Sequence, residues 1–175
     1  THRDDQCFWL YTSGTTGYPK GVIHLHHDTV YCIEVSRSFL GITPDDRTFC
    51  APKLFSSFGL VVFLTASGSG ASAALYEGRP TPERMFEGIQ RFRPTIFAAV
   101  PTLLASMLQV PNAERYDLSS LRFCVTGGES LPLPVYYGWK ERLGVEVVEL
   151  FGATEIHALF LGNRPGEVRP GSIGR

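Results

Sequence analysis

Glycine and hydroxyl residues surround a lysine near the start of the chain, in the segment from Thr12 to Gly21. Its glycines permit a tight turn with exposed backbone N–H groups, and its serine and threonine hydroxyls add further hydrogen-bond donors. Lys20 supplies a positive charge on a long side chain. A loop of this composition suits phosphate oxygens. We therefore predict phosphate contacts from Thr12, Ser13, Gly14, Thr15, Thr16, Gly17 and Lys20.

The spacing of this segment differs from that of the P-loop. A P-loop has four residues between its glycines and a Lys-Ser or Lys-Thr pair directly after the second glycine. Here only two residues separate Gly14 from Gly17, and Lys20 is followed by Gly21. A P-loop kinase or GTPase is therefore disfavoured, and the remaining alternative is a loop that only turns the chain.

The alternation of strand-like and helix-like segments predicts an α/β fold, with a mostly parallel sheet that helices cover on both faces. Ligands bind in such sheets at loops that leave the carboxyl ends of strands, so we expect chemistry after Thr12, Thr126 and Leu150. The expected strands are 7–12, 47–51, 71–76, 95–100, 122–126 and 145–150. The expected helices are 28–40, one beginning near Gly59, 82–92, 101–109 and 134–143.

Composition restricts the class of protein. With 175 residues, of which 43% are hydrophobic and 19% charged, the chain has the size and apolar content of one folded domain. The formal net charge of -1 disfavours a nucleic-acid partner that is bound through bulk positive charge. The longest apolar stretch, Phe58 to Ala66, is too short to cross a membrane. We expect the four cysteines to be reduced and buried, and the protein to be cytoplasmic.

Three motifs resemble the adenylate-forming family, which includes acyl-CoA synthetases, luciferases and the adenylation domains of peptide synthetases. They are YTSGTTGYPKG, ending at Gly21; FGATE, from Phe151 to Glu155; and RPGSIGR, from Arg169 to Arg175. The segments 53–60, 126–132 and 160–166 look most similar to benzoate-CoA ligases and their hydroxybenzoate relatives. The resemblance covers nearly the whole chain, and it implies the large AMP-binding domain of such an enzyme.

The resemblance also implies roles for individual residues. Lys20, Thr154 and Glu155 would be catalytic: Thr154 would contact the α-phosphate of ATP, and Glu155 would bind Mg²⁺, an ion that prefers carboxylate oxygen. The remaining ATP contacts would come from Gly128, Glu129, Ser130, Gly152 and Ala153. Taken alone, Glu155 also fits a solvated surface acid, and Glu129 fits an ordinary helix entrance.

The acyl pocket is expected at Ser57, Phe58, Gly59, Gly152 and Leu159, because small residues beside an aromatic ring form a slot for a planar acid. Phe58 could equally be a core residue. The sequence departs from the benzoate-activating pattern after Glu155, since that pattern has a histidine at the position of Ala158.

The histidine of this segment is instead His157, which leaves the ring substituents of the acid open. A separate group, His24, His26 and His27, lacks an acid or cysteine at ligand spacing, so we expect it to be structural rather than metal-binding.

The expected activity is ATP- and Mg²⁺-dependent conversion of a small aryl carboxylate to an acyl-adenylate, followed by thioester formation with coenzyme A. One alternative is a loading domain that transfers the acyl group to the phosphopantetheine of a carrier protein. Another is a nucleotide-binding module without catalysis. We expect residues 1–175 to be a fragment of the large N-terminal domain, inactive alone because the C-terminal lid domain would lie beyond Arg175. The sequence does not indicate an oligomeric state.

Overall fold

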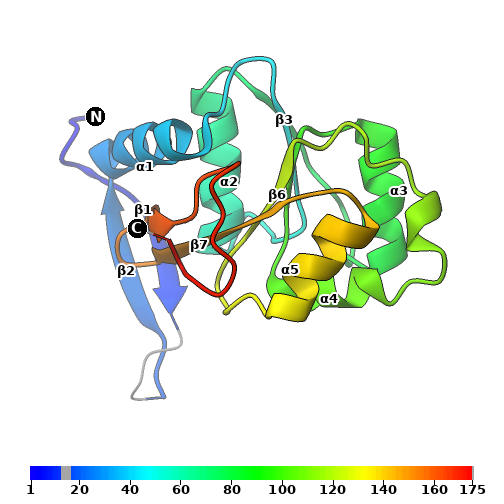
Figure 1. Ribbon diagram of the computed structural model, residues 1–175. Coiled ribbons are helices and arrows are strands. Elements are labelled where there is room, and N and C mark those ends of the chain that lie inside the picture. The colour runs from blue at the N-terminus through cyan, green and yellow to red at the C-terminus, as the bar shows by residue number, and fades with distance from the viewer. Residues whose placement is uncertain (13–16, 175) are drawn as a thin grey trace.

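The central element of the structure is a six-stranded sheet (Figure 1). The computed structural model describes residues 1–12 and 17–174, so the predictions for 13–16 lie outside the described residues. Within them the strand order is β4-β3-β5-β6-β7-β8, and every neighbouring pair is parallel except β7 with β8. The strands are β3 (Arg47–Cys50), β4 (Ser72–Ala74), β5 (Ile96–Ala98), β6 (Phe123–Thr126), β7 (Val147–Ala153) and β8 (Ala158–Gly162). The predicted fold class is confirmed.

Helices cover both faces of this sheet. One face packs against α1 (His26–Leu40) and α2 (Ser57–Gly68), and the other against α3 (Pro82–Phe92), α4 (Pro101–Leu108) and α5 (Leu133–Tyr137). A 3₁₀ turn (Ala113–Arg115) follows α4, and a π-helical turn (Gly138–Arg142) continues α5. Ile96 and Ala98 point toward α2 while Phe97 packs beside Trp139. Burial on both sides explains why β5 is continuously apolar.

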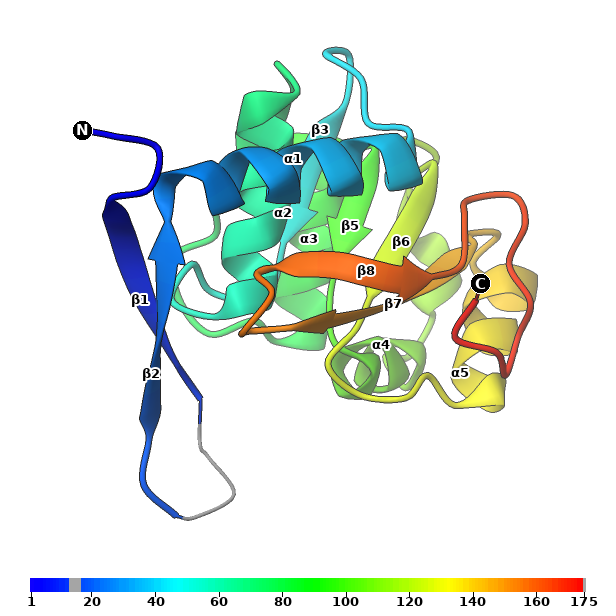
Figure 2. The same cartoon turned by 90° about the vertical axis from the view of Figure 1, so that its left-hand side faces the viewer.

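A two-stranded antiparallel hairpin stands beside the main sheet (Figure 2). It consists of β1 (Gln6–Thr12) and β2 (Lys20–Leu25). We did not predict β2 or β8 from the sequence, and the expectation that the loop after Thr12 leaves the same sheet as the other two site loops was wrong. Thr12 instead pairs with Lys20 across the hairpin. Figure 2 shows the turn between β7 and β8 pointing toward this hairpin.

Local signals explain where the helices begin and end. Helix α3 follows Thr81 and has Pro82 in its first turn, where a missing N–H costs nothing. Helix α1 begins after Leu25, whose backbone N–H donates to the Asp28 carboxylate at 2.8 Å, and it ends at Gly41 with φ 60°. The predicted strand 71–76 was too long, because only Ser72–Ala74 pair with β3.

The cysteines differ in exposure. Cys32 and Cys124 are buried and Cys50 is half-buried, but Cys7 is exposed, so the prediction of burial was wrong for Cys7. All four are free thiols, and burial raises the pKa of Cys50 to about 12 and that of Cys32 to about 11. In the part of the chain that the structure describes, no helix has the length and apolar character needed to cross a membrane.

A buried carboxylate connects the amino ends of β3, β5 and β6. Asp46 is 3% exposed, and its oxygens accept hydrogen bonds from Arg122 at 2.6 and 2.7 Å and from the Thr95 hydroxyl at 2.6 Å. Burial by itself would raise the pKa of Asp46, but these hydrogen bonds, together with one from the Thr43 backbone, lower it below the usual 3.8. The network holds three strands at the end of the sheet opposite the site loops.

Replacing Asp46 with alanine leaves the Thr95 hydroxyl and the Arg122 guanidinium without their acceptor, so the free energy of unfolding should fall by about 2–3 kcal/mol. Chemical denaturation at pH 7 measures this change. Because the pKa of Asp46 is lower in the folded state, its contribution is complete above about 3.8 and is lost as the pH falls below that value. The difference between wild type and Asp46→Ala should therefore shrink on acidification. An unchanged difference at pH 2.5 would contradict the account.

Candidate active site

A cleft of about 260 Å³ lies where β6, β7, β8 and the first turn of α2 meet. The parallel pairing of β6 with β7 puts Thr126 opposite Glu149, so the loops that follow both strands emerge at the same edge. The residues that line the cleft are Ser57, Phe58, Val61, Gly127, Gly128, Leu150, Gly152, Ala153, Thr154, Ala158 and Leu159. Three segments that are distant in sequence therefore form one surface.

The residues predicted for the acyl pocket are mostly found here. Ser57, Phe58, Gly152 and Leu159 line the cleft. The Ser56 side chain begins α2 by accepting the Gly59 N–H at 3.1 Å, which directs the Ser57–Phe58 end of the helix toward the cleft. Gly59 itself is buried in the helix and is not among the lining residues.

The loop after β6 approaches the β7 backbone closely. A Cβ atom on Gly127 would lie 2.7 Å from the Leu150 carbonyl oxygen, so a larger residue does not fit without movement. Gly128 has φ 85°, which favours glycine. Both line the cleft, whereas Glu129 and Ser130 are exposed and lie outside its lining. Of the three residues predicted to contact ATP here, Gly128 is thus at the cleft, and Glu129 and Ser130 face solvent.

Glu149 supports this loop, and we did not predict it. Its side chain is 7% exposed, and one carboxylate oxygen accepts the Leu131 N–H at 2.8 Å. The backbone oxygen of Glu149 also accepts the Asn163 N–H at 3.0 Å. The sequence does contain a signal for this role, a glutamate within the apolar run VVELF. A glutamate in such a run is expected to be buried, and a buried carboxylate requires a hydrogen-bond partner.

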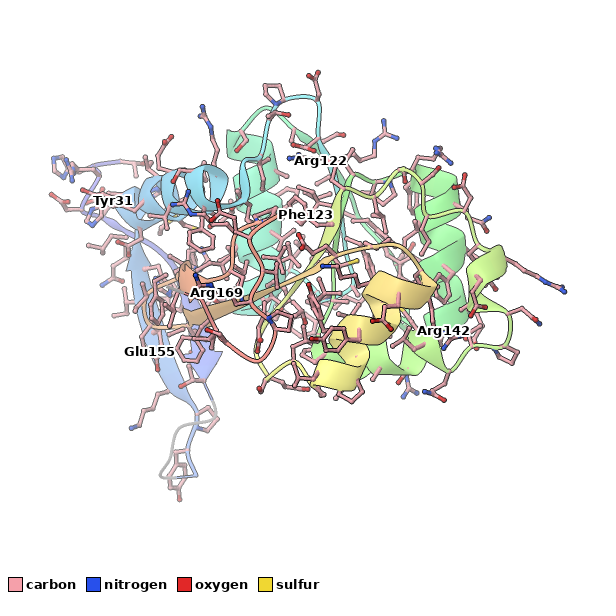
Figure 3. The ribbon with its side chains drawn as sticks, in the orientation of Figure 1. Tyr31, Arg122, Phe123, Arg142, Glu155 and Arg169 are labelled. Carbon is pink, nitrogen blue, oxygen red and sulfur yellow. The ribbon has the colours of Figure 1, made fainter. Side chains whose placement is uncertain are left out.

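The FGATE motif spans the end of β7 and the following turn. Gly152, Ala153 and Thr154 line the cleft, while Glu155 is exposed in the turn 154–157. Backbone N–H groups of Ile156 and His157 donate to the Ala153 oxygen at 3.2 and 3.0 Å and close this turn. Figure 3 shows Glu155 beside the β1–β2 hairpin.

The described part of the phosphate-loop segment is at the far end of the hairpin. Gly17 and Lys20 are exposed, and Thr12 is half-buried opposite Lys20. No described hairpin residue is among those that line the cleft. The hairpin instead contacts the Glu155-bearing turn through His157, whose ring centroid lies 5.0 Å from Phe8 and 4.8 Å from His24. The structure therefore puts the hairpin that carries the predicted phosphate-binding segment against the turn that carries Glu155, with the contact at Phe8 and His24 rather than at Lys20.

His157 and Ala158 face different surroundings. Ala158 lines the cleft, and His157 is fully buried against the hairpin. Burial lowers the pKa of His157 to about 4, with a further decrease from nearby His24 that outweighs the opposite effect of Asp28, so its ring is neutral at pH 7. At the position where the benzoate-activating pattern has a histidine, the cleft is lined by a methyl group.

Glu155 is a single exposed carboxylate, and this limits how it could bind a metal ion. Among residues 1–12 and 17–174, no group of three His, Cys, Asp or Glu side chains could hold a metal ion. Mg²⁺ in nucleotide enzymes is usually bound by one or two carboxylates, substrate phosphates and water, so a single exposed glutamate fits that mode of Mg²⁺ binding better than a protein-enclosed metal. His24 contacts rings and approaches Asp28, its Nδ1 being 3.6 Å from Oδ2.

The chain belongs to the AMP-binding enzyme family, whose model matches residues 1–175. It is 44% identical over 179 residues to a benzoate–CoA ligase of Thauera aromatica, in an alignment that covers 100% of this chain and 34% of that protein. It is 41% identical over 176 residues to a 4-hydroxybenzoate–CoA/benzoate–CoA ligase of Rhodopseudomonas palustris, with 99% and 33% covered. The resemblance to adenylate-forming enzymes and to aryl-CoA ligases is confirmed.

A solved structure gives the same result for the fold. The anthranilate CoA ligase AuaEII, in complex with anthranoyl-AMP, superposes with a TM-score of 0.97 at 41% identity, over 100% of this chain and 34% of that one. The chain thus spans about a third of the length of these relatives. The roles of the individual site residues stay predictions.

Gly127→Ala tests the close approach of the two site loops. The added methyl group would meet the Leu150 carbonyl oxygen, so the free energy of unfolding should fall by about 1–3 kcal/mol. Gly21→Ala is the matched control, because its Cβ would come no closer than 3.4 Å to the Tyr11 ring. Urea denaturation of both variants measures the difference. Equal stability of the two variants would show that the loop after β6 can move away freely.

Proposed function

We propose that residues 1–175 are a fragment of the large N-terminal domain of an ATP-dependent aryl-carboxylate–CoA ligase. The observation that carries this proposal is the cleft at the ends of β6 and β7, where Gly128, Gly152 and Thr154 meet Ser57 and Phe58. The proposed nucleotide-binding motifs and the proposed acyl pocket therefore share one surface. The chain spans about a third of the relatives' length, and in our proposal efficient turnover requires a C-terminal lid domain in addition to residues 1–175.

The reaction requires two anionic groups to approach each other. A carboxylate oxygen attacks the α-phosphorus of ATP and pyrophosphate leaves. A thiol then attacks the acyl carbon of the acyl-adenylate, so the thioester forms and AMP leaves. Catalysis of such a step is chiefly positioning and charge neutralisation. In our proposal Lys20 binds the triphosphate, and the Thr154 hydroxyl donates to the α-phosphate. Glu155 would hold Mg²⁺, which reduces the negative charge of the phosphates.

The loop after β6 would bind the adenine base. Gly127 and Gly128 have no side chains that would keep a flat ring away from the backbone, and the hydrogen bond from Leu131 to Glu149 holds the far end of the loop. Glu129 and Ser130 would reach the nucleotide from the exposed part of the loop. This arrangement leaves the Ser57 side of the cleft for the acid.

An aryl acid fits the cleft better than a long acyl chain. The volume of about 260 Å³ suits a single ring, and Phe58, Leu159 and Ala158 provide an apolar lining. The names of the relatives, which act on benzoate, hydroxybenzoate or anthranilate, support an aryl substrate and coenzyme A as the acceptor. Phosphopantetheine on a carrier protein is the alternative acceptor, and a carrier domain in the same protein would favour it.

The activity test is acid-dependent exchange of pyrophosphate into ATP by the full-length protein that contains this segment. We expect exchange with benzoate or a substituted benzoate, and a decrease of about 100-fold in Lys20→Ala because a phosphate-neutralising charge is lost. Lys140→Ala is the control, since Lys140 lies beyond α5 and its side chain contacts Tyr136. Absence of exchange with every aryl acid, while ATP still binds, would instead indicate a nucleotide-binding module without catalysis.

Ala158→Leu tests the assignment of the acyl pocket. The larger side chain would occupy part of the cleft, so the KM for the aryl acid should rise about tenfold while the KM for ATP stays within about twofold. Phe160→Leu is the matched control, because Phe160 lies two residues further along β8 and packs against Phe151 outside the cleft lining. Steady-state kinetics of both variants measures the two KM values. A rise in the KM for ATP alone would remove Ala158 from the acid site.

A further inference from the structure

Three aromatic rings join the β1–β2 hairpin to the turn between β7 and β8. Phe8 of β1, His24 of β2 and His157 of the turn contact each other pairwise, with ring centroids 5.1, 5.0 and 4.8 Å apart. His24 is 1% exposed and His157 is 0% exposed. We call these residues the ring cluster. It directly connects two elements that are not neighbours in any sheet.

The ring cluster is maintained at a free-energy cost. His157 has φ 50°, a backbone conformation that residues with a side chain seldom adopt. Within the described residues, neither ring nitrogen of His157 has a hydrogen-bond partner, and Nε2 of His24 has none either. Buried polar atoms without partners and strained backbone persist only where the surrounding structure imposes them, and they are frequent at functional sites.

The two sides of the ring cluster carry the residues that our proposed function places at the triphosphate and its metal ion. Lys20 and His24 share one face of β2, because side chains alternate along a strand, and that face is the one turned toward His157. Lys20 is about 13 Å from His24 along the strand at the usual rise per residue. On the other side, Glu155 precedes His157 by two residues in the same closed turn.

We propose that His24 and His157 are positioning residues whose ring packing sets the location of Lys20, at the start of β2, relative to Thr154 and Glu155. This inference rests on the proposed function for the roles of Lys20, Thr154 and Glu155. The geometric part, that the hairpin is anchored to the turn through these rings, is independent of it. No other described contact between aromatic rings joins the two elements.

Packing rather than imidazole chemistry performs this role. Both rings are shielded from solvent, and the imidazole nitrogens of His157 make no hydrogen bond to the described residues. A phenylalanine at position 157 would therefore keep the ring contacts without losing a hydrogen bond. Asparagine would remove the ring but is among the residues that best tolerate the left-handed conformation found there. This pair of substitutions separates the ring from the backbone conformation.

Hydrogen–deuterium exchange tests the anchor without any reference to activity. In the full-length protein, His24→Ala changes only the hairpin, yet amide exchange in the turn 154–157 should become about tenfold faster, because that turn loses its packing partner. Ile23→Ala is the matched control: Ile23 is the preceding residue on the same strand, is 50% exposed and lies on the opposite face. Unchanged exchange in the turn of His24→Ala would overturn the anchor.

Kinetics of pyrophosphate exchange tests the positioning role. His157→Asn should raise the KM for MgATP about tenfold and leave the KM for the acid within about twofold, because only the triphosphate end of the site is displaced. His157→Phe should restore values close to wild type. In the double variant His24→Ala/His157→Asn the increase should be smaller than the product of the two single increases, since both single variants remove the His24–His157 contact.

The outcomes separate the two levels of the inference. Wild-type protein that shows no acid-dependent exchange, but whose turn is loosened by His24→Ala, would refute the proposed function and leave the anchor standing. If the wild type shows exchange and His157→Phe impairs it as strongly as His157→Asn does, packing is not the role of the ring. An equal rise in the KM for the acid and for MgATP would refute the specific effect on the triphosphate.

Discussion

The parallel pairing of β6 with β7 is the constraint on which the site depends. It aligns Thr126 with Glu149, so that the loop beginning at Gly127 and the end of β7 emerge together. The two backbones approach so closely that a side chain at Gly127 would collide with the Leu150 carbonyl. Glu149 then holds the other end of the loop through the Leu131 N–H. Moving either strand by one residue would separate the glycines from Thr154 and disassemble the cleft.

The remaining elements add residues to the cleft that this strand pairing forms. Helix α2 brings Ser57 and Phe58 to the same cleft, because the Ser56 cap fixes where the helix begins. Strand β8 turns back antiparallel and adds Ala158 and Leu159. At the opposite end of the sheet, the hydrogen bonds of Asp46 hold three strand starts together. Rigid strands thus support a site that consists mostly of loop and helix-end residues, a division common in α/β proteins.

The hairpin shows how a family likeness and an individual structure complement each other. The chain belongs to the AMP-binding enzyme family and is similar to aryl-CoA ligases, but neither fact explains what holds the hairpin in place. The contacts of Phe8 and His24 with His157 provide a physical answer. His157 in the turn packs against the hairpin, and the next residue, Ala158 at the start of β8, lines the cleft.

Sequence alone determined the α/β class, most helix and strand positions and the site motifs, because hydrophobic period, proline and glycine placement, and loop composition are local properties. It did not reveal β2, whose residues mix polar and apolar side chains, or β8, a short apolar run that periodicity alone does not assign. Both become strands by pairing with β1 and β7. Nor did it reveal that Glu149 supports a loop or that His24 meets His157. Those relations join residues 18 and 133 positions apart, respectively, and only the folded chain brings them into contact.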